Sequence, residues 1–523
     1  MQREKSYAIL YEYEQAGGKK LATVGRDIMF VAGFDNEKYL KLQSQSIKER
    51  IAAFGGKLYL EFGGKLFDDF HASRVLPGFA PDSKIRMLTE LKDEAEVIIA
   101  INTEDIEKNK VRGDLGITYD LDVLRLIDAF RAAGLYVGSV VMTRYRENSI
   151  AIAFKEKLEH LGIKVYKNYA IEGYPYNIPY IVSDEGFGKN EYAQTTRSLI
   201  VVTAPGPGSG KMATCLSQIY HESKRGIKSG YAKFETFPIW NLPLNHPVNL
   251  AYEAATADLN DMNMIDPFHL EAYGVPTVNY NRDVEIFPVL RSMLAGILGE
   301  CPYKSPTDMG VNMAGFCIFD DVAVANASKQ EVVRRYYCAL CNRRKGNGSD
   351  SEVHKIEMLM QQLSCDIAMD RPCVGAALKK AESTEQPAVA IELNDGSVVT
   401  GKTSSLLGAS AAALLNALKH YALIDDATDI LPHHVLEPIQ KIKTENLGNH
   451  NPRLHTDEIL IALAVSAADS PLSAKALEAL PKLRDCEVHS TVILSQVDTN
   501  TFRKLGMNLT CEPRYQTKKL FHN

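Results

Sequence analysis

The sequence predicts an α/β protein built around a Rossmann-like domain with a mainly parallel sheet and a P-loop-like turn. Between residues 33 and 305, short apolar runs alternate with amphipathic segments of helix length, which is typical of βαβ units. From 306 to 370 the pattern is mainly helical, and from 371 to 523 it alternates again. We therefore expect a helical middle segment and a smaller C-terminal α/β subdomain, after an N-terminal extension formed by residues 1–32.

The first helix signal lies just after this extension. Asp35 is a suitable N-cap, and Gly55-Gly56 is a typical helix stop. Further helices are expected over 83–92, 120–134 and 151–162. Strands are expected over 57–62, 95–102, 136–145, 163–169, 178–184 and 198–205. Ligands of a parallel sheet bind at the carboxyl ends of its strands, so useful side chains should follow these strands.

The second half of the chain opens with two expected helices, 328–341 and 351–365. Two β-forming runs then flank Asn394-Asp395-Gly396, which is a strong hairpin signal. The remaining pattern predicts a strand over 489–497 and helices over 410–422, 456–468, 474–483 and 499–506.

Composition excludes several classes of protein. The 523 residues carry a net charge of −6, which disfavours a general nucleic-acid binder. The N-terminus has no apolar signal core, and no run approaches about 18 apolar residues, so we expect a cytoplasmic protein without a membrane partner. The nine cysteines have no framework spacing. Cys338 and Cys341 form a C-x-x-C pair, but a helix with incidental cysteines is favoured over a metal or redox site.

The glycine-rich stretch "VVTAPGPGSGKMAT" is the main functional signal. A phosphate-binding loop uses glycines so that backbone N–H groups converge on the anion, and its lysine adds a point charge. Two departures from the Walker pattern are Pro205 at the first glycine position and Met212 at the position of the Mg²⁺-binding hydroxyl. The predicted phosphate-binding residues are Gly206, Gly208, Ser209, Gly210, Lys211 and Thr214. The alternative is a sharp strand-to-helix turn with a solvated lysine.

Acidic residues after other expected strands are candidates to hold Mg²⁺. Asp184 ends the apolar run 178–184, as in a Walker B segment, and is the predicted metal ligand. Asp320-Asp321 offers a similar arrangement. For each of these positions a helix cap or turn is the competing interpretation.

Two other polar clusters are candidates for chemistry. Asp69, His71 and Arg74 follow the first expected strand, and we assign them with Lys211 as candidate catalytic residues, because an Asp–His pair transfers protons and Arg clamps an anion. A surface helical turn is equally consistent with the pattern. The stretch 241–274 is rich in Asn, Asp and His without metal-ligand spacing, and its candidate ligands are His246, Asp258, Asp261, Asp266 and His269. Further polar loop residues are Asn281, Arg282, Asp283, Lys304, Ser305, Thr307 and Asp308.

Together these features favour an enzyme that binds ATP with Mg²⁺, or another small phosphorylated molecule. Phosphoryl transfer and ligase-type activation are the expected reaction classes. The alternative is a nucleotide- or metabolite-binding protein, or an oligomeric scaffold, without turnover. Because polar loops this dense also build subunit interfaces, a homo-oligomer is expected in either case.

Several long strings carry a resemblance to a known family, among them "GGKLFDDFHASRVLPGF", "KNKVRGDLGITYD", "VTAPGPGSGKMATCLSQIYHE" and "RKLGMNLTCEP". From about Gly33 to the C-terminus the chain resembles a bacterial family, the domain of unknown function numbered eighteen forty-six. The resemblance implies a multi-domain α/β protein with a separate C-terminal subdomain and no settled activity. It assigns no catalytic residue.

Overall fold

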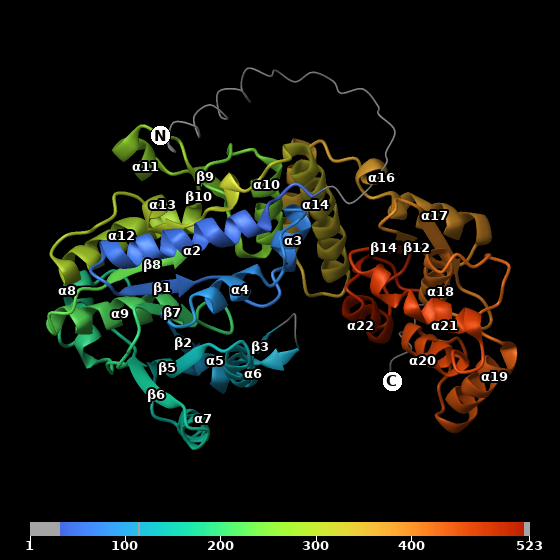
Figure 1. Ribbon diagram of the computed structural model, residues 1–523, viewed down its shortest axis with the longest axis horizontal. Coiled ribbons are helices and arrows are strands. Elements are labelled where there is room, and N and C mark those ends of the chain that lie inside the picture. The colour runs from blue at the N-terminus through green and yellow to red at the C-terminus, as the bar shows by residue number, and fades with distance from the viewer. Residues whose placement is uncertain (1–31, 113–115, 517–523) are drawn as a thin grey trace. The chain divides into compact units, whose positions relative to one another are not determined.

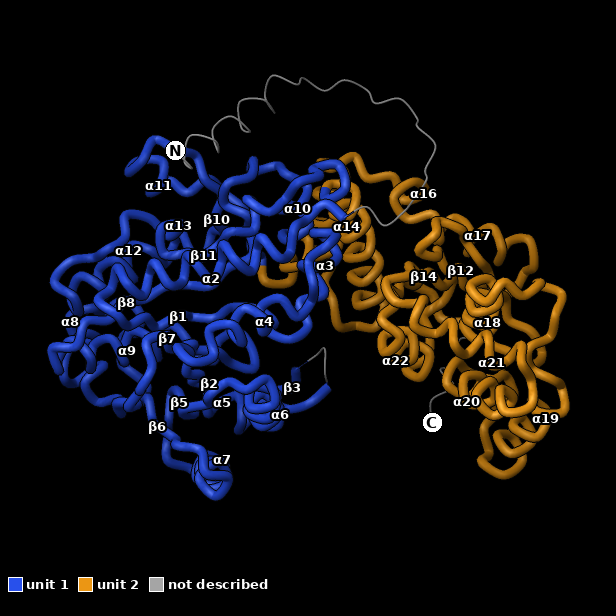
Figure 2. The backbone as a smooth tube through the Cα atoms, in the orientation of Figure 1, with its two compact units in different colours: residues 1–17, 32–253, 260–324 blue, residues 18–31, 254–259, 325–523 orange. Residues whose placement is uncertain are grey.

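The computed structural model describes residues 32–112 and 116–516. Contacts within the chain divide it into two compact units (Figure 2). Among the described residues, unit 1 contains 32–112, 116–253 and 260–324, and unit 2 contains 254–259 and 325–516. None of the helices formed by the described residues combines the length and apolar character needed to cross a membrane.

Unit 1 is built on a seven-stranded sheet in which every neighbouring pair of strands is parallel (Figure 1). The strand order is β11-β8-β1-β7-β2-β5-β6. The strands are β1 Leu58–Phe62, β2 Ala95–Asn102, β5 Tyr136–Tyr145, β6 Lys164–Tyr169, β7 Leu199–Thr203, β8 Gly230–Phe234 and β11 Gly310–Val311. Two small antiparallel pairs, β3 Val111–Arg112 with β4 Ile117–Thr118 and β9 Asn263–Ile265 with β10 Val278–Tyr280, lie outside this sheet.

Helices cover the sheet on both faces. Helices α9 (Lys211–Lys224) and α12 (Asn281–Leu298) pack on the face that carries Tyr59, Ile200 and Tyr231. The opposite face is covered by α4 (Ser83–Glu90), whose Lys84 ammonium lies over the ring of Phe234. The other α-helices of unit 1 are α2 Asn36–Ala53, α3 Phe70–Val75, α5 Thr103–Glu107, α6 Tyr119–Ala132, α7 Ser149–His160, α8 Ile178–Ile181, α10 Pro247–Ala255, α11 Pro267–Tyr273 and α13 Pro306–Met309.

The path of the chain reverses at the central strand β7. After β1 the chain passes β7 to reach β2, and after β7 it passes β1 in the other direction to reach β8. Right-handed crossovers that run in opposite directions place their helices on opposite faces of the sheet. Helices α4 and α9 lie on opposite faces in this way. The loops that follow β1 and β7 therefore diverge at the carboxyl edge of the sheet, where open α/β sheets form a ligand crevice.

Unit 2 contains a four-stranded mixed sheet in the order β13-β12-β14-β15. Its strands are β12 Ala388–Glu392, β13 Val398–Lys402, β14 Glu487–Ser490 and β15 Asn508–Cys511, and only β14 and β15 are parallel. Helix α14 (Asp321–Arg344) begins in unit 1 and continues in unit 2. The other α-helices of unit 2 are α15 Asp350–Gln362, α16 Ile367–Asp370, α17 Pro372–Thr384, α18 Ala409–Tyr421, α19 His433–Lys441, α20 Thr456–Ser466, α21 Pro471–Glu478 and α22 Gln496–Lys504.

The predicted mixed α/β architecture with a large parallel sheet is confirmed, and so are the Asp35 cap and the hairpin at 394–396. The strand predicted over 178–184 was wrong, because this segment forms the short helix α8 followed by turns. The strand predicted over 489–497 is shorter, since β14 ends at Ser490. Strand β11 joins the large sheet from inside the segment that was expected to be helical. The predicted extension, residues 1–32, lies outside the described residues except for Ala32.

Candidate functional site at the carboxyl edge of the large sheet

The glycine loop, residues 204–210, connects β7 to α9. Glycine is required at each of the loop's three glycine positions, either by the backbone conformation or by lack of space for a side chain. A Cβ at Gly206 would lie 2.2 Å from the Tyr119 hydroxyl, and Gly208 and Gly210 have φ values of +79° and +86°. A Cβ at Gly210 would also lie 2.9 Å from the Thr143 side chain. The turn alone therefore accounts for the glycines.

The two hydroxyls predicted to bind phosphate or Mg²⁺, one in the loop and one in the first turn of α9, both donate to backbone carbonyls of the loop. The Ser209 hydroxyl donates to the Gly206 carbonyl at 3.0 Å, and the Thr214 hydroxyl donates to the Gly210 carbonyl at 2.9 Å. Both residues are buried. The Thr143 hydroxyl donates to the Ser209 carbonyl at 2.8 Å and fixes the loop to the end of β5.

Lys211 is the first residue of α9, and its environment differs from that of an ordinary surface lysine. The side chain is half-buried, and within residues 32–112 and 116–516 it makes no hydrogen bond or ion pair. The first turn of α9 contains no acidic residue, and its N-cap, Gly210, offers no side-chain cap. The free backbone N–H groups and the helix dipole are already positive here, so the ammonium adds charge of the same sign.

A second cation lies near this loop. Arg144 follows Thr143 in β5, has a φ of +49°, and its carbonyl accepts a hydrogen bond from the Thr103 hydroxyl at 2.8 Å. Its guanidinium is largely exposed and lies 3.8 Å from Glu104. Burial and the negative charge of Glu61 raise the pKa of Tyr174 to about 12, and the positive charge of Arg144 partly offsets this rise. Arg144 and Glu61 therefore lie at the same edge of the sheet.

The structure does not bring Asp184 to the glycine loop. Its carboxylate accepts a hydrogen bond from the Tyr220 hydroxyl at 2.5 Å and pairs with the Lys224 ammonium at 3.2 Å. Tyr220 and Lys224 lie about 14 and 20 Å along α9 from Lys211, at the opposite end of the helix. The strand that the comparison with a Walker B segment required before Asp184 is replaced by the short helix α8, and the role of Asp184 as a metal ligand stays a prediction.

The predicted catalytic cluster after β1 is largely occupied by structural contacts. Asp69 caps α3 by accepting from the Ala72 amide at 3.2 Å, and it forms a buried ion pair with Lys84 at 2.6 Å. Burial raises the pKa of Asp69, but Lys84 and the Ala72 amide outweigh it and lower the pKa overall. His71 packs against the rings of Phe237 and Tyr252, and Arg74 lies in the last turn of α3. Asp69 is therefore a stabilising partner of Lys84.

The polar residues between 241 and 308 also form pairs. His246 contacts Asp321 at 2.8 Å, and Asp261 pairs with Arg282 at 2.5 Å. Asp266 caps α11 and accepts from the Thr307 hydroxyl. Throughout the described ranges, no group of three or more His, Cys, Asp or Glu side chains is placed to hold a metal ion.

Sequence reasoning missed a buried group of charges at the end of β8, which we call the Lys233 cluster: Lys233, Glu235, Tyr280, Asp283 and Glu61. The Lys233 ammonium lies 2.9 Å from Glu235 Oε1 and also contacts Asp283 Oδ2 and the Tyr280 hydroxyl. Glu61 stands beside Lys233 in the register of β1 with β8, and it accepts a hydrogen bond from Tyr231 at 2.7 Å. The side chains of Lys233, Glu235 and Asp283 are only 10–15% exposed.

The Lys233 cluster holds one ammonium and three carboxyl groups. Burial lowers the pKa of Lys233, but Asp283 and Glu235 outweigh it, so the pKa stays well above the usual value and the lysine stays charged. Burial raises the pKa of Glu235, and the neighbouring Asp283 raises it further. Lys233 offsets only part of this rise, so the pKa of Glu235 is about 8. Only Asp283 belonged to a stretch that the sequence marked as polar. Lys233 and Glu235 lie in "GYAKFETF", which shows no motif.

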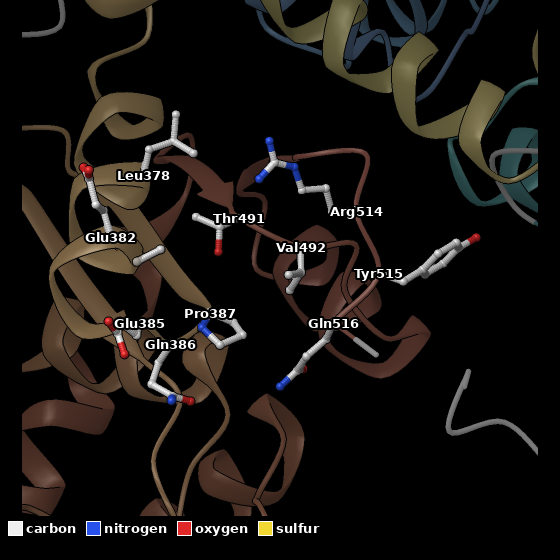
Figure 3. Close-up of a pocket in the computed structure, with 11 residues that line it drawn as sticks. Leu378, Glu382, Glu385, Gln386, Pro387, Thr491, Val492, Arg514, Tyr515 and Gln516 are labelled. Atoms are coloured by element: carbon white, nitrogen blue, oxygen red, sulfur yellow. The ribbon is translucent and has the colours of Figure 1, made fainter. Parts of the chain in front are cut away.

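Unit 2 has an open pocket of about 470 Å³ near the carboxyl ends of the parallel strands β14 and β15 (Figure 3). Glu382 and Glu385, near the end of α17, line one side. Thr491 and Arg514 follow β14 and β15. The Thr491 hydroxyl accepts a hydrogen bond from the Ala388 amide at the start of β12, so this side chain has a structural role at the edge of the pocket.

Comparison with known proteins places this chain among its relatives. Residues 32–364 match the model described as Domain of unknown function DUF1846, N-terminal, and residues 369–521 match its C-terminal counterpart. The chain belongs to the DUF1846 family. This confirms the resemblance drawn from the sequence strings. All residues of the glycine loop and of the Lys233 cluster lie within the N-terminal match of this family.

Similar DUF1846 proteins occur in several bacteria. The UPF0371 protein DIP2346 of Corynebacterium diphtheriae is 59% identical over 490 residues, covering 94% of this chain and 98% of the relative. A UPF0371 protein of Streptococcus thermophilus is 59% identical over 488 residues, covering 93% and 99%. One from Streptococcus pneumoniae is 58% identical with the same coverage. The similarity extends over nearly the whole chain, and these names carry no activity.

Proposed function

We propose that this protein is an enzyme that binds a small phosphorylated molecule at the glycine loop, with Lys211 and the first turn of α9 as the phosphate site. The observation that carries the proposal is the half-buried Lys211 without a partner among the described residues. A positive charge at the positive end of a helix is unfavourable for folding, and an anion at that position reverses the sign of the interaction.

The position of the loop supports the same proposal. It follows the central strand β7, where the loops of neighbouring strands diverge to opposite faces of the sheet. Arg144 adds a second positive charge nearby, and its strained backbone conformation is typical of functional positions. The phosphate site would thus combine backbone N–H groups with two cations from different strand ends.

ATP is one candidate ligand, and any Mg²⁺ would arrive with its phosphates. The Ser209 and Thr214 hydroxyls bond to the loop backbone, and Asp184 lies at the other end of α9. The protein's own contribution at this site would be positive charge and backbone N–H groups, which bind phosphate with or without a metal ion.

The test is thermal unfolding of the wild type and Lys211→Ala with ATP, pyrophosphate and sulfate, each with and without Mg²⁺. Ligand at about 100 times its Kd should stabilise the wild type by about 2.7 kcal/mol, and the variant should lose that shift. Lys224→Ala is the matched control, since it removes a lysine from the other end of the same helix. The proposal fails if no anion stabilises the wild type, or if both variants lose the shift equally.

A further inference from the structure

The Lys233 cluster is close to the proposed phosphate site. Val202, Glu61 and Lys233 stand in one row across β7, β1 and β8. Two strand spacings separate β7 from β8, so the ends of these strands are about 10 Å apart. Glu61 links the two places electrostatically, because its charge acts on Lys233 and also on Cys215, which lies one turn after Lys211 in α9.

The carboxylate of Glu235 has a defined position within the cluster. It lies just after β8, and a Cβ at Gly310 in the neighbouring strand β11 would stand 2.9 Å from its Oε2. The absence of a side chain at Gly310 therefore leaves the space that this carboxyl group occupies. On its other side Glu235 faces the Lys233 ammonium at 2.9 Å.

We propose that Glu235 is the proton donor and acceptor for the ligand held at the glycine loop, with Lys233 and Asp283 as its positioning residues. This inference rests on the proposed phosphate site, which supplies the substrate class. The carboxyl group of Glu235 would protonate an oxygen or nitrogen of a phosphorylated molecule that reaches across the two strand spacings, about 10 Å, from the end of β7 to the end of β8. The O–H bond of Glu235 breaks, and a lone pair of the ligand atom forms the new bond to the proton. The electron pair of the broken bond stays on the carboxylate, whose negative charge is neutralised by the Lys233 ammonium.

The charges around Glu235 suit this role. Lys233 stays protonated, so it neutralises the carboxylate and is not itself the proton carrier. Asp283 places a second negative charge beside Glu235 and favours its protonated form, which agrees with a pKa of about 8. The other titratable or charged groups that face this site are Glu61 from β1, Tyr252 from α10, Tyr280 from β10, Arg282 from α12, and Asp261.

The experiment is an infrared titration of the full-length protein, in which a protonated carboxyl group gives a C=O band distinct from that of a carboxylate. The ligand-free wild type should show a protonated carboxyl band that disappears with a midpoint near pH 8. Glu235→Gln should abolish that band. Glu285→Gln, an exposed position on α12, should leave it intact and serves as the control. Thermal unfolding of each variant confirms that it is folded.

Pyrophosphate is the probe for coupling to the phosphate site. Its negative charge about 10 Å away should raise the midpoint by about one pH unit. Lys211→Ala should remove this shift and keep the ligand-free titration. The inference is overturned if the wild type has no titrating carboxyl band, if Glu235→Gln keeps it, or if bound pyrophosphate leaves the midpoint unchanged. If pyrophosphate does not stabilise the wild type but the band still titrates, the phosphate site has failed, and with it the substrate proposed for Glu235.

Discussion

Lys211 places a positive charge at the end of α9 where the helix dipole is also positive, and its side chain is half-buried. Without a ligand this arrangement opposes folding. We expect Lys211→Ala to raise the free energy of unfolding by about 0.3–1 kcal/mol in buffer free of phosphate and sulfate. Urea denaturation followed by circular dichroism measures the change.

Lys224 is the matched control at the other end of the helix. It pairs with Asp184 near the C-terminus of α9, where the dipole favours a cation. Lys224→Ala should therefore lower stability or leave it unchanged. Equal losses for the two variants would show that Lys211 stabilises the fold like any other lysine, and would remove the argument for an anion at this position.

A substitution at Gly310 tests whether the Glu235 carboxyl group lies next to this glycine. A Cβ at Gly310 would lie 2.9 Å from Glu235 Oε2, so Gly310→Ala should displace the carboxyl group and cost about 1–3 kcal/mol of stability. It should also move the midpoint of the Glu235 titration. Gly208→Ala is the control: its Cβ meets nothing within 4 Å, but its φ of +79° costs about 1 kcal/mol. An unchanged midpoint in Gly310→Ala would contradict the placement of Glu235.

Single residues explain which parts of the site the sequence could reveal. The glycine loop was visible because Gly206, Gly208 and Gly210 fall within five consecutive residues, although packing and backbone conformation alone require them. Lys233 was not visible, since Asp283 is 50 residues away and reaches it only through the fold. Local patterns predict loops, whereas a site assembled from several strand ends has no local signal.

At the level of elements, burial decides which predictions succeed. Strands β2 and β7 are buried along their whole length, so their sequences are nearly continuous apolar runs and were recognised. The run 178–184 is also apolar, but its Pro179 occupies the start of helix α8, where a missing N–H costs nothing. A short apolar run is compatible with either structure, and the proline favoured a helix start.

The His455–Asp498 pair joins the N-termini of α20 and α22, and its stabilisation depends on pH. The Asp498 hydrogen bond raises the pKa of His455, so this contribution is present below about pH 6.5 and is lost as the pH rises through the folded pKa. Burial raises the pKa of Asp498, but His455 and the Thr456 amide lower it overall. Its contribution is therefore present above about pH 4 and is lost on acidification.

Asp498→Asn keeps an acceptor for the Thr456 amide and removes the charge. It should cost about 1.5–3 kcal/mol near pH 5, where both partners are charged, and less near pH 9. Urea denaturation of the wild type and variant at the two pH values measures this difference. A loss that is the same at both values would mean that the charge of His455 contributes nothing.

At the scale of the whole molecule, the family matches and the compact units divide the chain at different places. The N-terminal family model extends to residue 364, whereas unit 1 ends at Val324. The boundaries predicted from the sequence, 305/306 and 370/371, differ from both and stay predictions. The sequence showed a change to helical pattern near 306, but it could not show that most of α14 packs with the C-terminal sheet.

Contacts within unit 2 indicate that α14 is part of its core. The buried Arg334 pairs with Glu487 of β14 at 3.0 Å, and the ring of Tyr337 packs against His489 with the ring centroids 4.8 Å apart. Val333 and Tyr337 also form an apolar cluster with Val374 of α17. A fragment that begins at the C-terminal family model would lose all of these contacts.

We therefore expect residues 325–523 to fold cooperatively as a fragment, and residues 369–523 to be about 2–5 kcal/mol less stable, because the shorter fragment loses the apolar contacts of Val333 and Tyr337. Glu487 also loses Arg334 in that fragment but keeps its ion pair with Arg371. Near-ultraviolet circular dichroism and urea denaturation of the two fragments measure this difference. Arg334→Met in the longer fragment is the control, since it removes the ion pair and keeps the apolar contacts of α14. Equal stability of the two fragments would show that α14 is dispensable and would favour the boundary at 370/371.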